Sequence, residues 1–210
     1  MLGLVLTAGG ARGAYQAGVL KRIGQLPALR RAPSPFAVVA GASAGAINGT
    51  MIAATSENLQ QGTEALARLW SGLTVRDVFR SDLLTLGTSA ARFGFDLATG
   101  GRFGGAGTAA LFDTGPLRAF LARTLPVDGL APAIRRGDLY ALALSATSYH
   151  SGRSYTFIQG RAGHPLWRKS RRVTVPVDIT SDHVYASAAI PIVFPPAQLQ
   201  GAGPDLFFGD

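Results

Sequence analysis

The chain has 210 residues, of which 47% are hydrophobic and 15% charged, a composition that excludes a disordered chain and provides enough apolar surface for a packed core. It contains no cysteine, which excludes disulfides, thiolate catalysis and cysteine-ligated metal centres. Twenty basic and twelve acidic residues give a net charge of +8, which favours anionic partners of several kinds and identifies none of them.

The first 55 residues have the pattern of two strand–helix units. Residues 2–7 form an apolar run that ends in glycines, typical of a strand buried on both faces, and residues 36–40 form a second run. Helices are predicted at residues 14–25 and 46–54. The apolar face of the first helix would carry Tyr15, Val19, Ile23 and Leu26. This order predicts an α/β fold whose parallel strands bring their following loops to one edge of the sheet.

The remaining segments show no linker, so we expect residues 1–210 to form a single domain. Further helices are predicted at 57–73, 116–125 and 181–189, and strands at 139–147, 154–159 and 206–208. The glycine-rich residues 100–107 predict a loop. Basic residues gather between 161 and 172, where they form either a solvated loop or a contact with an anionic surface. Aromatic residues do not alternate with these cations, so nucleic acid is not an expected partner.

A serine follows the second predicted strand in a glycine-flanked turn. Gly41, Ala42, Ser43, Ala44 and Gly45 match G-x-S-x-G, in which a strained turn between strand and helix exposes a nucleophilic hydroxyl. The motif alone is weak in a chain with 27 glycines, and a helix-capping serine is the alternative. The strand before Ser43 and the helix after it are the context that the chemistry requires, so Ser43 is the candidate nucleophile.

A second cluster of small residues follows the first predicted strand. Gly9, Gly10, Ala11, Arg12 and Gly13 stand at the corresponding junction, so their backbone N–H groups could form an oxyanion hole beside Ser43. Their spacing does not fit a dinucleotide fingerprint or a phosphate-binding P-loop. No nucleotide cofactor is therefore expected.

The base that would activate Ser43 is less clear from the residues alone. His150 and His164 lie in predicted loops, whereas His183, in a predicted helix, could complete a Ser-His-Asp triad. Asp210 follows an aromatic strand, and Phe207 and Phe208 could desolvate it and raise its pKa. No histidine lies in an H-E-x-x-H motif, so no metal site is predicted.

Four segments together resemble the bacterial patatin-like phospholipases. They are AGGARGAYQAGVL at 8–20, GASAGAING at 41–49, FDTGPL at 112–117 and ASAAIPIVFPP at 186–196. The resemblance spans nearly the whole chain and implies a three-layer α/β/α fold with a largely parallel central sheet. It also implies a Ser-Asp dyad without histidine, with Ser43 as nucleophile, the loop from Gly9 to Gly13 as oxyanion hole, and the Asp of a terminal D-G-[GA] motif, here Asp210, as base.

Two departures from the family pattern stand out. Ala8 occupies the first of three positions that are usually glycine, and Asp210 is the last residue, so the two residues expected after it are missing. We therefore interpret the sequence as a truncated part of a longer protein.

The leading hypothesis is a serine acyl hydrolase of the phospholipase A or lysophospholipase type, acting on acyl esters of lipids without a cofactor. The alternatives are a non-catalytic lipid- or anion-binding module with the same fold, and a triad esterase that uses His183. Residues 190–194 and 100–107 are candidates for an acyl-chain wall and a mobile cover. With no signal peptide and no apolar stretch of bilayer length, a cytoplasmic location is expected, with possible contact to an anionic membrane.

Overall fold

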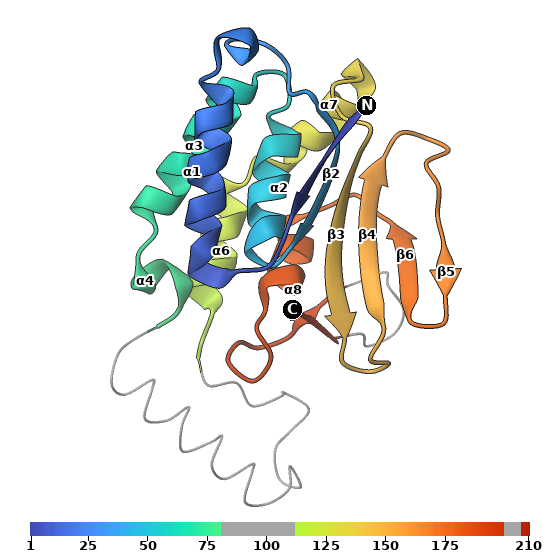
Figure 1. Ribbon diagram of the computed structural model, residues 1–210. Coiled ribbons are helices and arrows are strands. Elements are labelled where there is room, and N and C mark those ends of the chain that lie inside the picture. Colours follow the sequence, from blue (N-terminus) through green and yellow to red (C-terminus); the bar gives the residue numbers. More distant parts are fainter. Residues whose placement is uncertain (81–111, 200–206) are drawn as a thin grey trace, which may run out of the picture.

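The computed structural model describes residues 1–80, 112–199 and 207–210, which form one mixed sheet flanked by helices (Figure 1). Three neighbouring strands, β1 (Leu2–Leu6), β2 (Phe36–Ala42) and β3 (Ala141–Ser148), pair in parallel. Leu6 pairs with Gly41, and Ala42 pairs with Ser145. The loops after β1 and β2 therefore leave the sheet side by side, as the sequence predicted.

The other half of the sheet begins with β4 (Ser154–Gly160), which is antiparallel to β3. It continues with β6 (Arg172–Pro176), parallel to β4, and ends with β5 (Arg168–Lys169). The short strands β7 (Ala197–Gln198) and β8 (Phe207–Gly209) pair with each other, and β8 also pairs with β3. Residues 161–172, predicted as a loop or a surface contact, thus include β5 and the first residue of β6.

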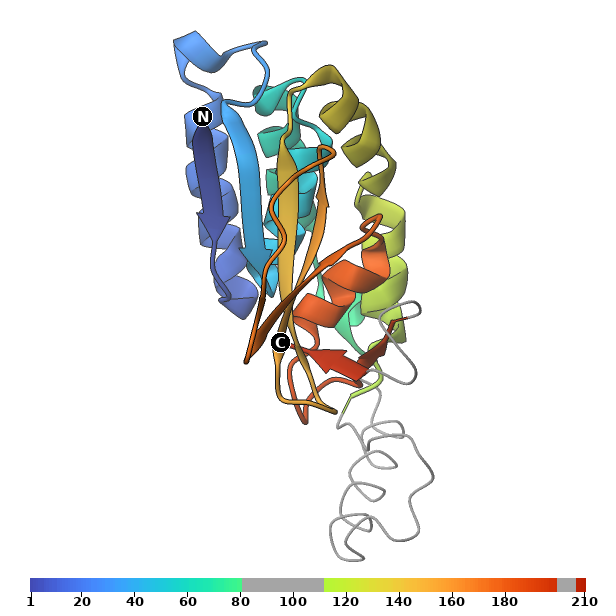
Figure 2. The same ribbon diagram turned by 90° about the vertical axis from the view of Figure 1, so that its right-hand side faces the viewer.

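The crossover helices lie on one face of the sheet, because β1, β2 and β3 are added in the same direction with right-handed connections (Figure 2). The described helices are α1 (Gly13–Gly24), α2 (Ala44–Ala54), α3 (Leu59–Gly72), α4 (Val75–Val78), α6 (Gly115–Thr124), α7 (Leu130–Arg136) and α8 (Ser181–Ala188), of which α8 follows β6 and is not part of these crossovers. Single turns of 3-10 helix occur at Gly10–Arg12, Pro27–Leu29 and Val127–Gly129. Among the described residues, no helix has both the length and the apolarity needed to span a membrane.

Helix α2 lies in the centre of the helical layer, and all eleven of its residues are buried. Its small side chains let neighbouring backbone approach closely, as at Gly45, where a Cβ atom would overlap the carbonyl group of Leu6 in β1. This approach fixes the start of α2, the helix that follows Ser43, against the end of β1.

Two predictions about burial are wrong. Tyr15 of α1 is 78% exposed, and the buried face of this helix consists of Gly13, Ala17, Leu20 and Gly24. Glycine is required there because a Cβ atom at Gly24 would overlap the Thr63 side chain of α3. The first strand is not buried on both faces either, since Val5 is 75% exposed on the face that the described helices leave open. The close packing of small residues therefore decides which face of α1 is buried. The spacing of large apolar residues, from which the helix was predicted, gives no information on such packing.

The predicted α/β class with a mostly parallel central sheet flanked by helices is confirmed. The helices and strands expected from periodicity are present with shifts of a few residues at their ends, whereas α4, α7 and the strands β5, β6 and β7 were not predicted. Residues 100–107 and Leu206 lie outside the described residues. The expectations of a single domain and of a truncated chain stay predictions.

Candidate active site

Ser43 occupies the turn between β2 and α2 in a strained backbone conformation. Its φ of 54° and ψ of −124° lie in a region that favours glycine, at a cost of about 1–3 kcal/mol. The residue is only 4% exposed. A Cβ atom at Gly41 would overlap the backbone of Gly45, so the flanking glycines are needed for this sharp turn. The strain is of the kind that proteins maintain where a side chain must be held in one orientation.

The loop from Gly9 to Gly13 lies against the start of α2. A Cβ atom at Gly13 would stand 2.8 Å from the Cβ atom of Ala44, so the loop can approach Ser43 only with glycine at this position. The N–H of Arg12 donates to the Gly9 carbonyl at 3.0 Å, and that of Gly13 points to the carbonyls of Gly10 and Ala11. The N–H groups of Gly10 and Ala11 begin the 3-10 turn and therefore have no acceptor within it. These two amides therefore remain able to bind another group.

A buried asparagine ties this loop to the helix that follows Ser43. Asn48 Nδ2 donates to the Gly13 carbonyl and to Gln16 Oε1, both at 3.0 Å, while Trp70 Nε1 donates to Asn48 Oδ1 at 2.7 Å. Gln16 Nε2 in turn donates to the Thr7 carbonyl at 3.0 Å. Every polar atom of the Asn48 side chain is thus used. Sequence reasoning gave Asn48 no role, although a lone amide in a helix of small apolar residues must find partners.

Asp210 reaches the same edge of the sheet from the opposite direction. Thr147 of β3 pairs with Ser154 of β4 on one side and with Gly209 of β8 on the other, so β8 and β2 lie along the same edge of β3. The pairs Ala42–Ser145 and Gly209–Thr147 are two residues apart along β3, about 7 Å. Ser43 directly follows β2 and Asp210 directly follows β8, and these two strands run toward each other along this edge of β3.

The C-terminal end of α8 contacts both candidate residues. Ser187 Oγ accepts a hydrogen bond from the Ser43 N–H at 2.9 Å and donates to the Ser145 carbonyl at 2.6 Å. The carbonyl of Ala189 accepts from the Asp210 N–H at 2.9 Å. Ser187 is completely buried. Neither Ser187 nor Ala189 was predicted to take part in the site, and only the segment 186–196 in the family resemblance pointed to them.

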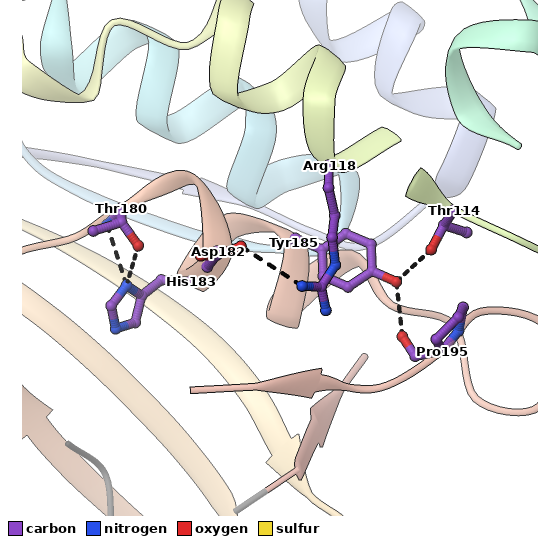
Figure 3. A network of polar contacts seen from close by, with 7 residues as sticks. All are labelled: Thr114, Arg118, Thr180, Asp182, His183, Tyr185 and Pro195. Carbon is purple, nitrogen blue, oxygen red and sulfur yellow. Dashed lines mark hydrogen bonds and ion pairs between the residues drawn. The ribbon is translucent and has the colours of Figure 1, made fainter. Parts of the chain in front are cut away.

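Helix α8 is itself anchored through Tyr185 (Figure 3). The Tyr185 hydroxyl donates to the Pro195 carbonyl at 2.7 Å and lies 2.6 Å from Thr114 Oγ1 at the start of α6. The Arg118 guanidinium stacks over the Tyr185 ring, 4.2 Å from its centre, and lies 3.9 Å from the Asp182 carboxylate. The fully buried Tyr185 thus connects α8 to α6 and to the turn after α8, and holds in place the helix end that contacts Ser43 and Asp210.

The surroundings of Asp210 differ from the expectation. Phe208 turns into the core, where its ring centre lies 5.3 Å from that of Phe157, and Asp210 itself is exposed. The expected desolvation of the carboxylate by its aromatic neighbours is therefore not found. The Tyr149 hydroxyl lies against the residue before Asp210, where it leaves no room for a Cβ atom at Gly209. Burial, and then the negative charge of Asp210, raise the pKa of Tyr149.

His183 has a structural role in the first turn of α8. Its Nδ1 accepts a hydrogen bond from the Thr180 N–H at 3.1 Å, which completes a capping box (Figure 3). Its ring packs edge-on against Phe157. A triad histidine instead donates from Nδ1 to a carboxylate and accepts the serine proton at Nε2. His150 and His164 are exposed. The hydrogen bonding of His183 therefore corresponds to the wrong tautomer for a triad.

We expect the His183→Gln variant to lose less stability than the wild type when the pH falls from 7 to 5. Burial lowers the pKa of His183 below 6.5, against the opposing charge of Asp182, so the unfolded state binds the proton more readily. The stability contributed by the neutral ring is present above pH 6.5 and is lost as the pH falls below it. Glutamine keeps the capping acceptor but does not titrate. Urea unfolding at several pH values tests this, and parallel curves for the two proteins would contradict it.

Two segments, residues 190–194 and 100–107, were predicted to contact the substrate. In residues 190–194, Phe194 is buried, whereas Ile190 and Ile192 are exposed just beyond Ala189. Ile192 has a φ of 70°, which is strained for a β-branched residue. Their role as an acyl-chain wall stays a prediction. The predicted cover at 100–107 falls outside the described residues.

The chain is similar to known proteins both in its sequence pattern and in its fold. The family model of the patatin-like phospholipases matches residues 4–207. The crystal structure of VipD from Legionella pneumophila has a similar fold, with a TM-score of 0.54 and 13% sequence identity; the likeness covers 100% of this chain and 45% of that chain. The present chain thus spans less than half the length of that protein, and a search of curated proteins found no significant match. Because the family model covers nearly all residues, the chain belongs to the patatin-like phospholipase family.

Proposed function

We propose that this protein is a serine hydrolase of lipid acyl esters that uses Ser43 as nucleophile and Asp210 as general base. Membership of a phospholipase family supports lipid acyl hydrolysis in general. The observation that carries the finer proposal links two residues 167 positions apart: the end of α8 accepts hydrogen bonds from the N–H groups of both, and both directly follow strands that pair with the same edge of β3. The exposed position of Asp210 suits a proton acceptor. The strained turn at Ser43 suits a nucleophile that is held in one orientation.

The proposed reaction has two halves. The Ser43 hydroxyl attacks the ester carbonyl while the Asp210 carboxylate takes its proton, and the carbonyl electron pair moves onto oxygen. Collapse of the tetrahedral intermediate breaks the ester bond, and the leaving alcohol receives the proton from Asp210. Water then attacks the acyl-enzyme with the help of Asp210, which releases the fatty acid and restores Ser43. No cofactor is consumed in either half.

Of the five residues predicted for the oxyanion hole, Gly10 and Ala11 have the N–H groups that suit the role. The amides of Arg12 and Gly13 already point to carbonyls within the loop. The contact between Gly13 and Ala44 keeps the loop beside Ser43. A preorganised donor of this kind contributes about 3 kcal/mol to transition-state stabilisation. Contact with an anionic membrane and a cytoplasmic location stay predictions.

A fluorophosphonate probe tests the proposal, because it phosphonylates only an activated serine. We expect stoichiometric labelling of the native protein, with mass spectrometry placing the adduct on Ser43 and none on the buried Ser187. Heat-denatured protein and the Ser43→Ala variant serve as controls and should remain unlabelled. Binding to lipid vesicles without labelling of native protein would instead indicate the non-catalytic module, and a label on another serine would exclude Ser43.

A further inference from the structure

The turn that carries Ser43 is connected to the neighbouring strand through the hydroxyl group of Ser187. Ser187 Oγ accepts a hydrogen bond from the Ser43 N–H at 2.9 Å and donates one to the Ser145 carbonyl at 2.6 Å. Ala42 and Ser145 form the last pair between β2 and β3, and Ser43 is the next residue of the chain. The hydroxyl group thus joins β3 to the first residue beyond β2, where the pairing of the two strands has ended.

The Ser43 backbone depends on this connection because it is both strained and buried. With φ at 54° and ψ at −124°, it has left the extended conformation of a strand. Ser43 is only 4% exposed, so solvent provides little compensation for an unpaired N–H. Strained conformations persist only where the surrounding contacts determine them. The bond to Ser187 is such a contact, and it acts directly on the backbone of the candidate nucleophile.

The connection requires a side chain that accepts and donates a hydrogen bond at once. A hydroxyl group does both, a thiol does both weakly, and a methyl group does neither. Ser187 is completely buried, between the buried Ala186 and Ala188 of α8. Solvent therefore does not replace its hydroxyl group, and a much larger side chain would overpack the site. The size and the bonding of serine both suit this position.

Ser187 is also held in a fixed place. Tyr185, two residues earlier in α8, is anchored by the hydrogen bond of its hydroxyl group to the turn after the helix (Figure 3). Two residues beyond Ser187, the Ala189 carbonyl accepts from the Asp210 N–H at 2.9 Å. The contact to Asp210 is made by the backbone, whereas the contact to Ser43 is made by a side chain. A substitution of Ser187 therefore changes the support of Ser43 and keeps the bond to Asp210.

We propose that Ser187 is a positioning residue, whose bond to the Ser43 N–H holds the Ser43 side chain in the orientation from which it attacks the ester. This inference rests on the proposed function, because it assigns a role in the same reaction. Ser187 does not itself reach the substrate, since its hydroxyl group is buried and bonded to a carbonyl. The bond also occupies the Ser43 N–H, which is therefore not among the donors available to the oxyanion.

The kinetics of the Ser187→Ala variant test the proposal. We expect kcat on p-nitrophenyl butyrate to fall about 10- to 100-fold and KM to change by less than about twofold, because a displaced nucleophile slows the chemical step without altering substrate binding. Phosphonylation by the fluorophosphonate probe, which needs no ester substrate, should slow by a similar factor. The midpoint of the pH profile should not move, since the bond that holds Asp210 is unchanged.

The Ser187→Cys variant provides a second, more conservative comparison. Its thiol is close to the hydroxyl group in size but donates and accepts only weakly, so its kcat should lie between those of the alanine variant and the wild type. If the alanine variant does not fold, the cysteine variant takes its place in the test, and a wild-type kcat in that variant would overturn the proposal.

Two control variants separate positioning from a general loss of stability. Ser56→Ala removes the same atom from a buried serine whose hydroxyl group has no partner among the described residues, so it should match the wild type. Leu59→Ala removes buried atoms at the start of α3, at the opposite end of that helix from Trp70, which contacts the Gly13 position. This variant should be less stable without a lower kcat in the folded fraction, which urea unfolding measures.

The possible failures can be told apart. A wild-type kcat in folded Ser187→Ala protein, a higher KM at constant kcat, or a shifted pH midpoint would overturn the positioning role. An equal fall of kcat in Leu59→Ala would overturn it as well, because the effect would then follow stability. Wild-type protein that neither hydrolyses the ester nor reacts with the probe would instead refute the proposed function.

Discussion

Replacing Ser43 with alanine should lower kcat on a lipid ester by on the order of 10³-fold or more, and Asp210→Asn should have an effect of similar size. Alanine removes the only atom that can form the acyl bond. Asparagine keeps the shape of the Asp210 side chain but cannot accept the proton that the hydroxyl must lose. Because the two groups act in one proton transfer, the double variant should be hardly slower than either single variant.

Matched controls separate the chemistry from general damage to the protein. Ser71→Ala and Asp128→Asn make the same atomic changes at exposed positions outside the candidate site and should retain full activity. All variants should show wild-type unfolding curves within about 0.5 kcal/mol, since neither candidate residue makes a described side-chain hydrogen bond. Independent, additive losses from the two substitutions, or more than a tenth of the wild-type rate in Ser43→Ala, would contradict a dyad.

The sequence predicted those parts of the molecule that depend on local pattern. Apolar runs ended by glycine located β1 and β2, and the small-residue turn between β2 and α2 located Ser43. Parallel pairing then placed the loop from Gly9 to Gly13 beside Ser43, because neighbouring parallel strands end at the same edge. These predictions are correct because each depends only on a local sequence pattern for a strand or a turn and on a general rule of sheet topology.

Features that arise from contacts distant in sequence were missed. The support of Ser43 by Ser187 joins residues 144 positions apart, and no periodicity indicates it. The burial of Phe208, which leaves Asp210 exposed, depends on how β8 crosses the core. Likewise, the buried face of α1 follows from the fit of glycines against α3 rather than from its apolar side chains. Apolar patterning thus identifies elements, whereas close packing decides their orientation.

The Asn48→Asp variant should be both less stable and slower than the wild type. Aspartate replaces the Nδ2 donor with an oxygen that faces two acceptors, the Gly13 carbonyl and Gln16 Oε1, and it places a carboxylate where no solvent reaches. The loss of two hydrogen bonds and the burial of an unpaired charge together should cost about 3 kcal/mol of unfolding free energy. Urea unfolding monitored by circular dichroism measures this cost.

The kinetic effect should distinguish a positioning role from a merely structural one. Asn48 holds the loop whose Gly10 and Ala11 amides would bind the oxyanion, so a shifted loop should lower kcat about 10- to 100-fold in the folded fraction and leave KM nearly unchanged. Asn58→Asp makes the same chemical change at the N-cap of α3, where aspartate caps as well as asparagine. That variant should match the wild type in stability and rate. If folded Asn48→Asp protein turned over at the wild-type rate, the hydrogen bond to Gly13 would stabilise the fold without positioning the oxyanion loop.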